Sequence, residues 1–301
     1  MTAALEMPGR MQLAVPSGRV GLRGAMAAEW TKLWSVRSTM WTLVAMSVAV
    51  IGLCAISTGT VSASDIIDDP TRRSLIGVFL GQLIFGVLGV LVMSAEYGTG
   101  TIRATLSAVP RRSVVLGAKV VVFGIVAVIV SEILTFSAFG VGQAILSAKH
   151  TVGPSAKILQ HAQQLGVPVP RQLPASFFSG SASLGQPDVL RAVVGAGLYL
   201  AVLGLLALGL ATVIRHTAGA IAAFVGVVLV LPLIVQALPT SISNAMARYL
   251  PANIGLVMFS THGVPDRIGP AFSPWAGFGL LVLYAVAILG LGCWVLVRRD
   301  A

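Results

Sequence analysis

The sequence predicts an all-α polytopic membrane protein with six transmembrane helices. Hydrophobic residues make up 56% of the 301 residues and charged residues only 10%, whereas an ordinary soluble domain carries about 25% charged residues. The apolar residues are gathered in blocks of about 20, the length that crosses roughly 30 Å of hydrocarbon. Because a bilayer offers no water to satisfy backbone amide groups, each block is predicted to be a helix.

The six blocks follow one another along the chain. They cover Thr39–Thr58, Leu75–Ala95, Val114–Gly140, Leu190–Ile214, Ala218–Leu238 and Trp275–Val297. Residues 1–23 contain no continuous apolar run and are predicted to be a flexible cytosolic leader, so that residues 24–300 form one transmembrane domain. Two connections are long: an outer loop at 141–188, and a segment at 239–274 whose apolar run predicts an outer helical hairpin.

The charge distribution predicts how the chain lies in the membrane. The net charge of +10 would suggest nucleic acid as a partner of a soluble protein. Here the basic residues lie mainly in short connections between the apolar blocks, so the lipid bilayer is the expected partner and nucleic acid is not. Of the 20 Lys and Arg residues, 12 fall on the side of the two termini, which we therefore place in the cytosol.

A short helix is predicted before the first span, within residues 24–37. Four large apolar side chains fall on one face of such a helix: Met26, Trp30, Leu33 and Trp34. Glu29 and Lys32 avoid the centre of that face, and Arg37 closes the segment. This pattern is typical of a helix that lies in the membrane interface. The alternative is that the segment simply extends the first span.

The connection after the second span, EYGTGTIRATLSAVPRR, is the most informative stretch of the chain. Glu96 and Tyr97 stand where the span ends, and Gly100 permits a sharp change of direction. Thr101 is the predicted N-cap of a short helix over Ile102–Ala108, which carries Leu106 on one face. Such a helix would suit contact with a cytosolic partner, and a solvated basic loop fits the spacing equally well.

Polar residues inside the spans suggest a second candidate site. Glu132 lies deep in the third span, and an ionisable residue at that depth suggests a function. It would either face a cavity and contact a cation, or be protonated and bonded to a neighbour such as Gln82 or Ser131. Lys119 lies near the end of the same span and is expected only to extend its ammonium group to the cytosol. The four histidines lie in scattered connections, so neither a metal site nor a catalytic residue is predicted.

Several motifs in order resemble the type-2 permease family of ABC exporters, in particular actinobacterial members. The E-Y-x-x-G-T-x-R-x-x-L-x-x-x-P-R-R string begins at Glu96, and Ala28–Thr39 reads A-E-W-x-K-L-x-S-x-R-S-T. Arg215–Ala220, Leu231-Pro232 and the closing Arg298–Ala301 are similar to family members as well.

The resemblance implies a permease subunit of the bacterial cytoplasmic membrane. It implies that Gly100–Ala108 acts as a coupling helix docked on a separate ABC ATPase subunit, with Glu96 and Arg103 bracing it and Glu29–Arg37 as an interfacial elbow. A second permease copy is the expected partner. No phosphate-binding loop occurs in the chain, so ATP and Mg²⁺ would be bound by the partner subunit and no cofactor by this chain. The alternative function is an ion-gradient-driven transporter or channel that uses Glu132.

Overall fold

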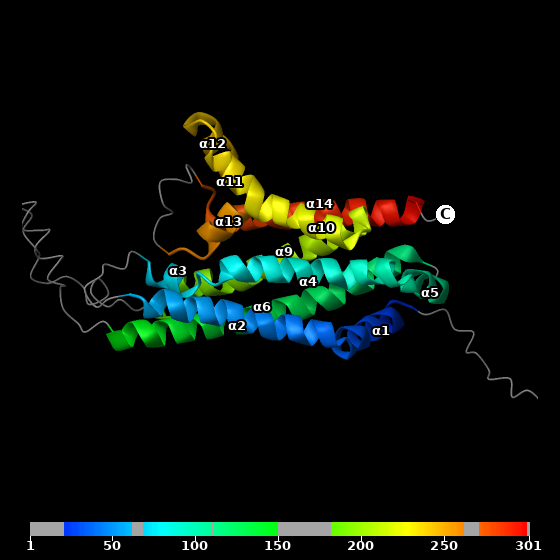
Figure 1. Cartoon of the computed structure of the whole chain (residues 1–301), viewed down its shortest axis with the longest axis horizontal. Helices are drawn as coiled ribbons and strands as arrows, with labels where there is room; N and C mark the ends of the chain where they lie inside the picture. Colours follow the sequence, from blue (N-terminus) through cyan, green and yellow to red (C-terminus); the bar gives the residue numbers. More distant parts are fainter. Residues whose placement is uncertain (1–20, 62–68, 110, 150–181, 262–270, 300–301) are drawn as a thin grey trace, which may run out of the picture.

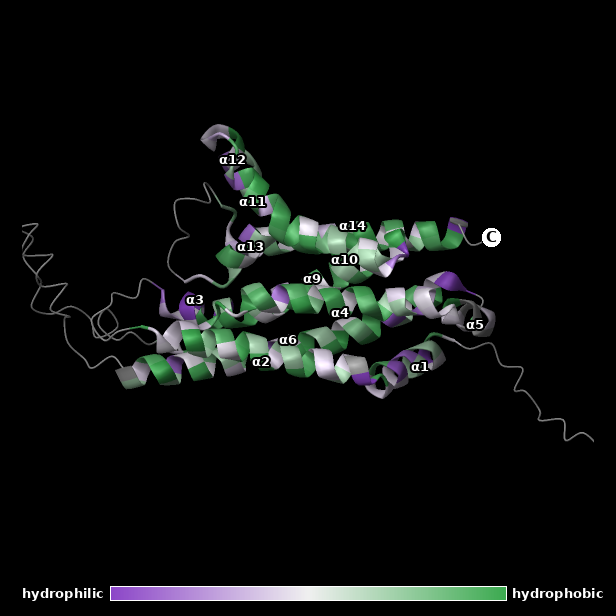
Figure 2. Cartoon of the chain, in the orientation of Figure 1, coloured by the Kyte–Doolittle hydropathy of each residue, from purple (hydrophilic) through white to green (hydrophobic). Residues whose placement is uncertain are grey.

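The computed structural model describes residues 21–61, 69–109, 111–149, 182–261 and 271–299. The described residues form helices and connecting turns, without a β-strand (Figure 1). Six of the helices are long and apolar enough to cross a membrane, and apolar residues run along their whole length (Figure 2). The chain is therefore described as a multi-pass membrane protein, as its sequence predicts.

The helices run in chain order from α1 to α14. Their bounds are α1 Leu22–Ser35, α2 Arg37–Gly59, α3 Pro70–Ser74, α4 Val78–Thr99, α5 Thr101–Ala108, α6 Arg112–Lys149, α9 Pro187–Ile214, α10 Thr217–Val225, the π-helical η1 Gly226–Val230, α11 Leu231–Gln236, α12 Thr240–Ala247, α13 Pro251–Met258 and α14 Pro274–Arg299. The six spans are α2, α4, α6, α9, the α10–η1–α11 unit and α14.

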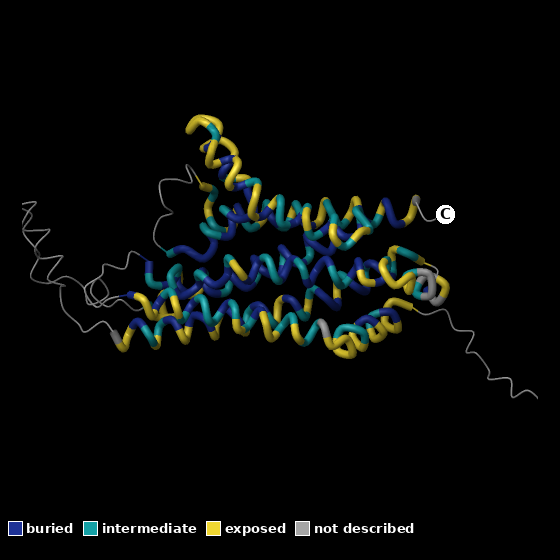
Figure 3. Tube along the Cα trace, in the orientation of Figure 1, coloured by how far each residue is buried: buried dark blue, intermediate teal, exposed yellow. Residues whose placement is uncertain are grey.

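The fourth span, α9, is the central helix of the bundle. It packs against α4, α6 and α14, and Figure 3 shows buried residues along most of its length. Small residues allow this close packing: a Cβ atom on Gly89 of α4 would lie 2.2 Å from the carbonyl oxygen of Gly204. Because lipid tails are as apolar as the helices, close contact between small residues is a main source of attraction between spans.

The spans give the bundle two ends. One end, here the α1 end, carries α1, α5 and the C-terminal end of α14 (Figure 1). The other, the α3 end, carries α3, α12 and α13 (Figure 1). The first and last described residues, Gly21 and Arg299, thus lie at the same end, as an even number of spans requires.

Two predicted boundaries are wrong. Helix α6 continues to Lys149, so residues 141–149 are helical rather than part of a loop, and α9 already begins at Pro187. The apolar and helix-favouring run Val141–Lys149 lacks Pro and contains a single Gly, so nothing in it stops the helix. The rest of the predicted outer loop, 150–181, lies outside the described residues, as does 1–20 of the predicted leader.

The segment before the first span is a separate helix and not an extension of that span. Val36 has an extended backbone, with φ −86° and ψ 111°, which ends α1 and begins α2 at Arg37. The elbow predicted to end at Arg37 therefore ends two residues earlier, at Ser35, and Arg37 belongs to the first turn of the span.

The fifth span and the segment after it are broken into short helices. Pro232 cannot donate a backbone hydrogen bond, and the π-helical η1 directly precedes it. Helices α11 and α12 lean away from the bundle at the α3 end (Figure 1). Pro251 begins α13, which packs back against α9 and α14, so the predicted helical pair within 239–274 is present as α12 and α13. Residues 262–270 of that segment lie outside the described residues.

Candidate functional site

Four charged side chains from three helices form one ion-pair cluster at the α1 end. The ammonium nitrogen of Lys119 in α6 lies 2.7 Å from Glu29 Oε2 of α1 and 2.7 Å from Glu96 Oε1 of α4. Lys32 of α1 lies 2.7 Å from the same Glu96 oxygen and 3.0 Å from Glu29 Oε1. We call Glu29, Lys32, Glu96 and Lys119 the ion-pair cluster.

Most of the cluster is withdrawn from solvent. The side chain of Lys119 is 1% exposed, and those of Glu29 and Glu96 are 7% and 9% exposed, whereas that of Lys32 is 43% exposed. Two carboxylates and two ammonium groups balance the charge, which offsets the high cost of removing each ion from water. The cluster therefore holds α1 against the bundle through groups that are costly to leave unpaired.

The spacing along α1 explains why its charged residues face inward. Ala25, Glu29 and Lys32 follow one another at intervals of four and three residues, so they share a face of the helix. Trp30 and Trp34 lie on the outer side, 47% and 46% exposed, with their ring centroids 5.7 Å apart. The two charged residues of this face are thus turned toward the bundle, and the two tryptophans are turned away from it.

The four large apolar residues of α1 do not share one environment, contrary to the sequence-based prediction. Trp30 and Trp34 are exposed, whereas Met26 packs against a small buried cluster that includes residues of α6, and Leu33 is half-buried. The reason is that α1 is packed on α6 along one side, which takes up part of the predicted apolar face.

The short helix after the second span is present as α5. Gly100 has a left-handed backbone with φ +71°, which favours glycine and turns the chain out of α4. The same residue is the N-cap of α5, so the prediction of Thr101 as N-cap is wrong: Thr101 is the first helical residue, and its hydroxyl lies 2.9 Å from that of Thr99. The Lys32 ammonium lies 3.5 Å from Thr105 Oγ1 of α5, which brings the helix to the ion-pair cluster.

Two predicted coupling residues, Arg103 and Leu106, are placed within α5, but their side chains lie outside the described residues. Tyr97 is half-buried near the end of α4, and the guanidinium carbon of Arg215 lies 5.7 Å from the centre of its ring. The sequence thus predicted the position of α5. The ion-pair cluster beside α5 also contains Lys119, for which the sequence predicted no role beyond extending its ammonium group to the cytosol.

Lys32 has a raised pKa. Burial lowers the pKa of this ammonium group, but its hydrogen bonds to Glu96 and Glu29 and the negative charges of both carboxylates together outweigh that effect. The group is therefore held in its charged form at neutral pH, as the cluster requires.

A groove opens beside the ion-pair cluster. Its volume is about 1010 Å³, and its walls come from one face of α1 and one face of α4, with further residues from α2, α5 and α6. We call it the α1–α4 groove. All four residues of the ion-pair cluster line it, and the other lining side chains are mainly apolar or threonines.

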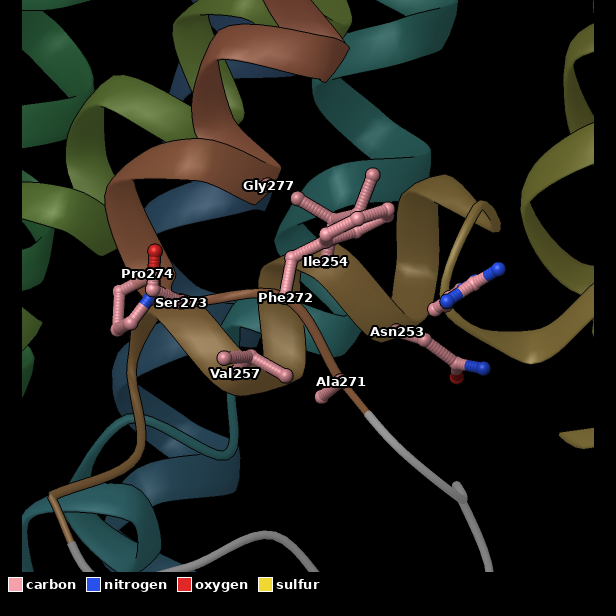
Figure 4. A pocket seen from close by; sticks show the side chains of 9 residues that line it. Asn253, Ile254, Val257, Ala271, Phe272, Ser273, Pro274 and Gly277 are labelled. Carbon is pink, nitrogen blue, oxygen red and sulfur yellow. The ribbon is translucent and has the colours of Figure 1, made fainter. Parts of the chain in front are cut away.

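A second hollow, at the α3 end, is too small for a ligand. Figure 4 shows it between α13 and the start of α14, where Ile254, Phe272 and Gly277 are among its lining residues. Its volume is about 10 Å³, roughly the space of one water molecule. Arg248 covers the ring of Phe272 at 5.6 Å and helps to close it.

The two intramembrane candidates are not brought together. Gln82 accepts a hydrogen bond of 2.6 Å from the Tyr199 hydroxyl of α9. Glu132 faces α9 at another point, so close that a Cβ atom on Gly197 would lie 2.6 Å from the carboxyl carbon. Both carboxylate oxygens of Glu132 are buried, and neither has a hydrogen-bond partner among the described residues.

Two arginines fix the last turn of α14 at the α1 end. Arg112, the first residue of α6, donates to the carbonyl of Leu296 at 3.0 Å, and Arg215 donates to the carbonyl of Val295 at 3.1 Å. Arg215 itself has a left-handed backbone with φ +60° at the end of α9. The sequence did not predict these contacts.

In the described part of the chain, no group of three His, Cys, Asp or Glu side chains is arranged to hold a metal ion. Comparison of the sequence with models of protein families gives no match, and comparison with curated proteins gives none either. The sequence motifs, together with the geometry of the helices and the ion-pair cluster, are therefore the basis for proposing a function.

Proposed function

We propose that this chain is the membrane-spanning permease subunit of an ABC-type exporter in a bacterial cytoplasmic membrane. It would move a substrate across the membrane with ATP hydrolysed by a separate ATPase subunit, and would work beside a second permease copy. The proposal rests on the motifs in Ala28–Thr39 and after Glu96 and on one structural observation. A short helix outside the spans, α5, lies against an ion-pair cluster that joins α1, α4 and α6.

The arrangement suits the transmission of force from a partner. Gly100 connects α5 directly to α4, and Lys32 contacts Thr105 from α1. A push on α5 would therefore reach two spans and α1 through groups that are costly to separate. In this proposal α5 is the coupling helix and α1 is the interfacial elbow, with its exposed tryptophans at the depth of the lipid head groups.

The charge distribution supports a cytosolic α1 end. Ten of the fifteen described Lys and Arg residues belong to this end: Arg23, Lys32, Arg37, Arg103, Arg111, Arg112, Lys119, Arg215, Arg298 and Arg299. Lys and Arg in short connections are retained on the cytosolic side of bacterial membranes. A cytosolic α1 end would present α5 to the compartment that holds ATP.

The test is a pull-down of the tagged full-length chain in mild detergent from its own host, with ATP hydrolysis measured on the eluate. We expect a stoichiometric ATPase subunit with the wild-type chain. Arg103→Glu in α5 should lose that subunit and its activity while the chain still inserts in the membrane. The matched charge reversal at the α3 end, Lys149→Glu, should retain both.

An ATPase-free eluate, under conditions that keep a known ABC complex intact, would overturn the proposal. Equal ATPase recovery with Arg103→Glu and wild type would instead remove α5 as the coupling surface.

A second candidate function is an ion-driven transporter, and Glu132 is the observation that favours it. A carboxyl group buried in a span without a hydrogen-bond partner is costly, which suggests that a proton or cation joins it during a working cycle. Proteoliposomes with an internal pH-sensitive dye test this directly. Proton uptake under a membrane potential should fall in Glu132→Gln if this candidate is right, and should be the same in both proteins if it is wrong.

A further inference from the structure

We propose that the α1–α4 groove binds one membrane phospholipid, with an acyl chain along α4 and the phosphate at the ion-pair cluster. The inference depends on the six spanning helices and is independent of the proposed export function. Its basis is the shape, the depth and the charge of the groove.

The shape of the groove matches a single hydrocarbon chain. On α4 the lining residues recur every three or four positions: Leu88, Leu91, Val92, Ala95, Glu96 and Thr99. On α1 the lining residues recur in the same way and include Ala25, Ala28, Glu29, Lys32 and Leu33. Two helical faces thus form opposite walls of one elongated groove.

The volume and depth agree with this occupant. The volume of about 1010 Å³ is at the upper end of ordinary ligand pockets, which hold roughly 300–1,000 Å³. From Thr99 to Leu88 the groove follows α4 for eleven residues, or about 16 Å at 1.5 Å per residue. One leaflet of hydrocarbon is about 15 Å thick. The groove therefore reaches from the end of the span to about the middle of the bilayer.

The groove is polar at one end and apolar at the other, as a lipid is. The ion-pair cluster, Thr101 and Thr105 lie at the α1 end, whereas Leu88 and Leu91 lie deepest along α4. Apolar side chains such as Leu91 are half-exposed in this groove, so an acyl chain would cover surface that no described helix covers.

Charge favours a phosphate at the polar end. Within the groove Lys32 and Lys119 balance Glu29 and Glu96, and the described part of the α1 end carries eight further basic residues and no further acidic one. Lys32 lines the groove and is 43% exposed, so its ammonium group is within reach of a head group. Because every glycerophospholipid carries a phosphate, we expect phosphatidylethanolamine and phosphatidylglycerol both to bind.

The test uses the full-length chain in vesicles of phosphatidylethanolamine and phosphatidylglycerol. A small part of one lipid carries a photoactivatable group in the middle of an acyl chain, in separate experiments for each head group. The protein is extracted and washed in detergent before irradiation, so that only retained lipid reacts, and adducts are located by peptide mass spectrometry. We expect adducts on peptides containing Leu88–Ala95 and Gly24–Leu33, with either head group.

Two variants fill the groove from opposite walls, Ala28→Trp and Leu91→Trp. Each should lower the retained lipid about tenfold, because the acyl chain loses the burial of a few methylene groups. Ala287→Trp, on an exposed face of α14, is the matched control and should retain the lipid. Size-exclusion profiles and melting temperatures show which variants are folded. The result is taken from the groove variant whose profile and melting temperature match those of the wild type.

The proposal is overturned by adducts spread equally over exposed faces of α2 and α14, by lipid retention that both groove variants leave unchanged, or by retention of one head group alone. It is also overturned if a photoreactive residue placed at Ala95 captures residues 1–20 or a second copy of the chain instead of lipid.

Discussion

At the scale of single residues, Lys119 is a fully buried charge that is held by two carboxylates. Its ammonium group is buried between the carboxylates of Glu29 and Glu96, at 2.7 Å from each. A buried ion pair contributes little over an apolar pair of the same size, but removing one partner leaves an uncompensated charge. The ion-pair cluster should therefore be destabilised by a substitution that removes one charge, and less so by a pair of substitutions that removes one positive and one negative charge.

We expect Lys119→Met to lower the free energy of unfolding by about 3 kcal/mol, since it leaves two buried carboxylates with one ammonium group. The double variant Lys119→Met/Glu29→Gln should recover part of that loss because it restores the charge balance. Thermal unfolding in detergent, followed by tryptophan fluorescence, measures both. Lys32→Met is the control and should cost less, because its side chain is 43% exposed. A double variant no more stable than the single one would contradict the account.

The raised pKa of Lys32 predicts how stability depends on alkaline pH. A group whose pKa is higher in the folded protein stabilises it fully below the unfolded pKa, which is about 10.4 for lysine. That contribution is lost as the pH rises through the folded pKa, which lies above the ordinary value. Wild type should therefore lose more of its melting temperature above about pH 10.5 than Lys32→Arg, whose guanidinium stays charged. Equal losses in the two proteins would show that Lys32 contributes nothing to this dependence.

The sequence identified Glu29, Lys32 and Glu96 separately, but not Lys119 as their partner. Glu29, Lys119 and Glu96 are far apart in the chain, and the packing of α1 and of α4 on α6 brings them together. A usable signal was nevertheless present: the two acidic residues of the described α1 end face a span that carries one lysine. For Glu132 the sequence placed the residue correctly within a span, but its contact with Gly197 depends on how α6 and α9 are rotated about their axes.

At the scale of helices, the end of α14 is held by side chains from elsewhere in the chain. The last four carbonyl groups of any helix lack partners within that helix. Arg112 donates to one of those at the end of α14, the carbonyl of Leu296, and Arg215 donates to the adjacent carbonyl of Val295. Arg191 donates to the carbonyls of Met258, the last residue of α13, and of Ser260. Guanidinium groups thus close helix ends at both ends of the bundle.

We expect the double variant Arg112→Ala/Arg215→Ala to speed hydrogen exchange in the last turn of α14 by about tenfold. Each lost hydrogen bond has a charged donor and contributes roughly 1.5–3 kcal/mol at most to the stability of this turn. Fraying of the helix end offsets part of that loss. Hydrogen–deuterium exchange with peptide mass spectrometry gives the rate. Arg191→Ala is the reciprocal control: it should speed exchange at the end of α13 and leave α14 unchanged. Unchanged exchange in the double variant would mean that these bonds do not hold the turn.

Helix existence was predictable from the sequence, and helix ends were less so. The six spans follow from apolar length, and α5 and the separate α1 follow from Gly100 and from the amphipathic pattern before the first span. The continuation of α6 to Lys149 was missed because its last turns are only moderately apolar. The sequence predicted the fifth span as one continuous helix. Pro232 interrupts the helical hydrogen bonds within this apolar block, which accounts for its division into α10, η1 and α11.

At the scale of the whole molecule, the distribution of charge predicts an orientation in the membrane. The basic residues are concentrated at the α1 end, which should therefore face the cytosol. In a chain with Cys54 and Cys293 replaced by alanine, Ser147→Cys on α6 should react with a membrane-impermeant maleimide added to intact cells. Ser107→Cys on α5 should react only after the cells are opened. The reverse pattern would place both described chain ends outside.

The length of α6 has a consequence for the membrane surface. Its 38 residues extend about 57 Å at 1.5 Å per residue, nearly twice the hydrocarbon thickness of about 30 Å. A common tilt of about 20° still leaves about 53 Å along the bilayer normal. At the α3 end Gln143 of α6 contacts the Ser74 hydroxyl and accepts a hydrogen bond from the amide of Ala182, so this part of α6 packs against other parts of the chain. Because α6 is longer than the hydrocarbon layer is thick, part of it must extend beyond that layer, and we expect the protein surface at the α3 end to stand above the membrane there.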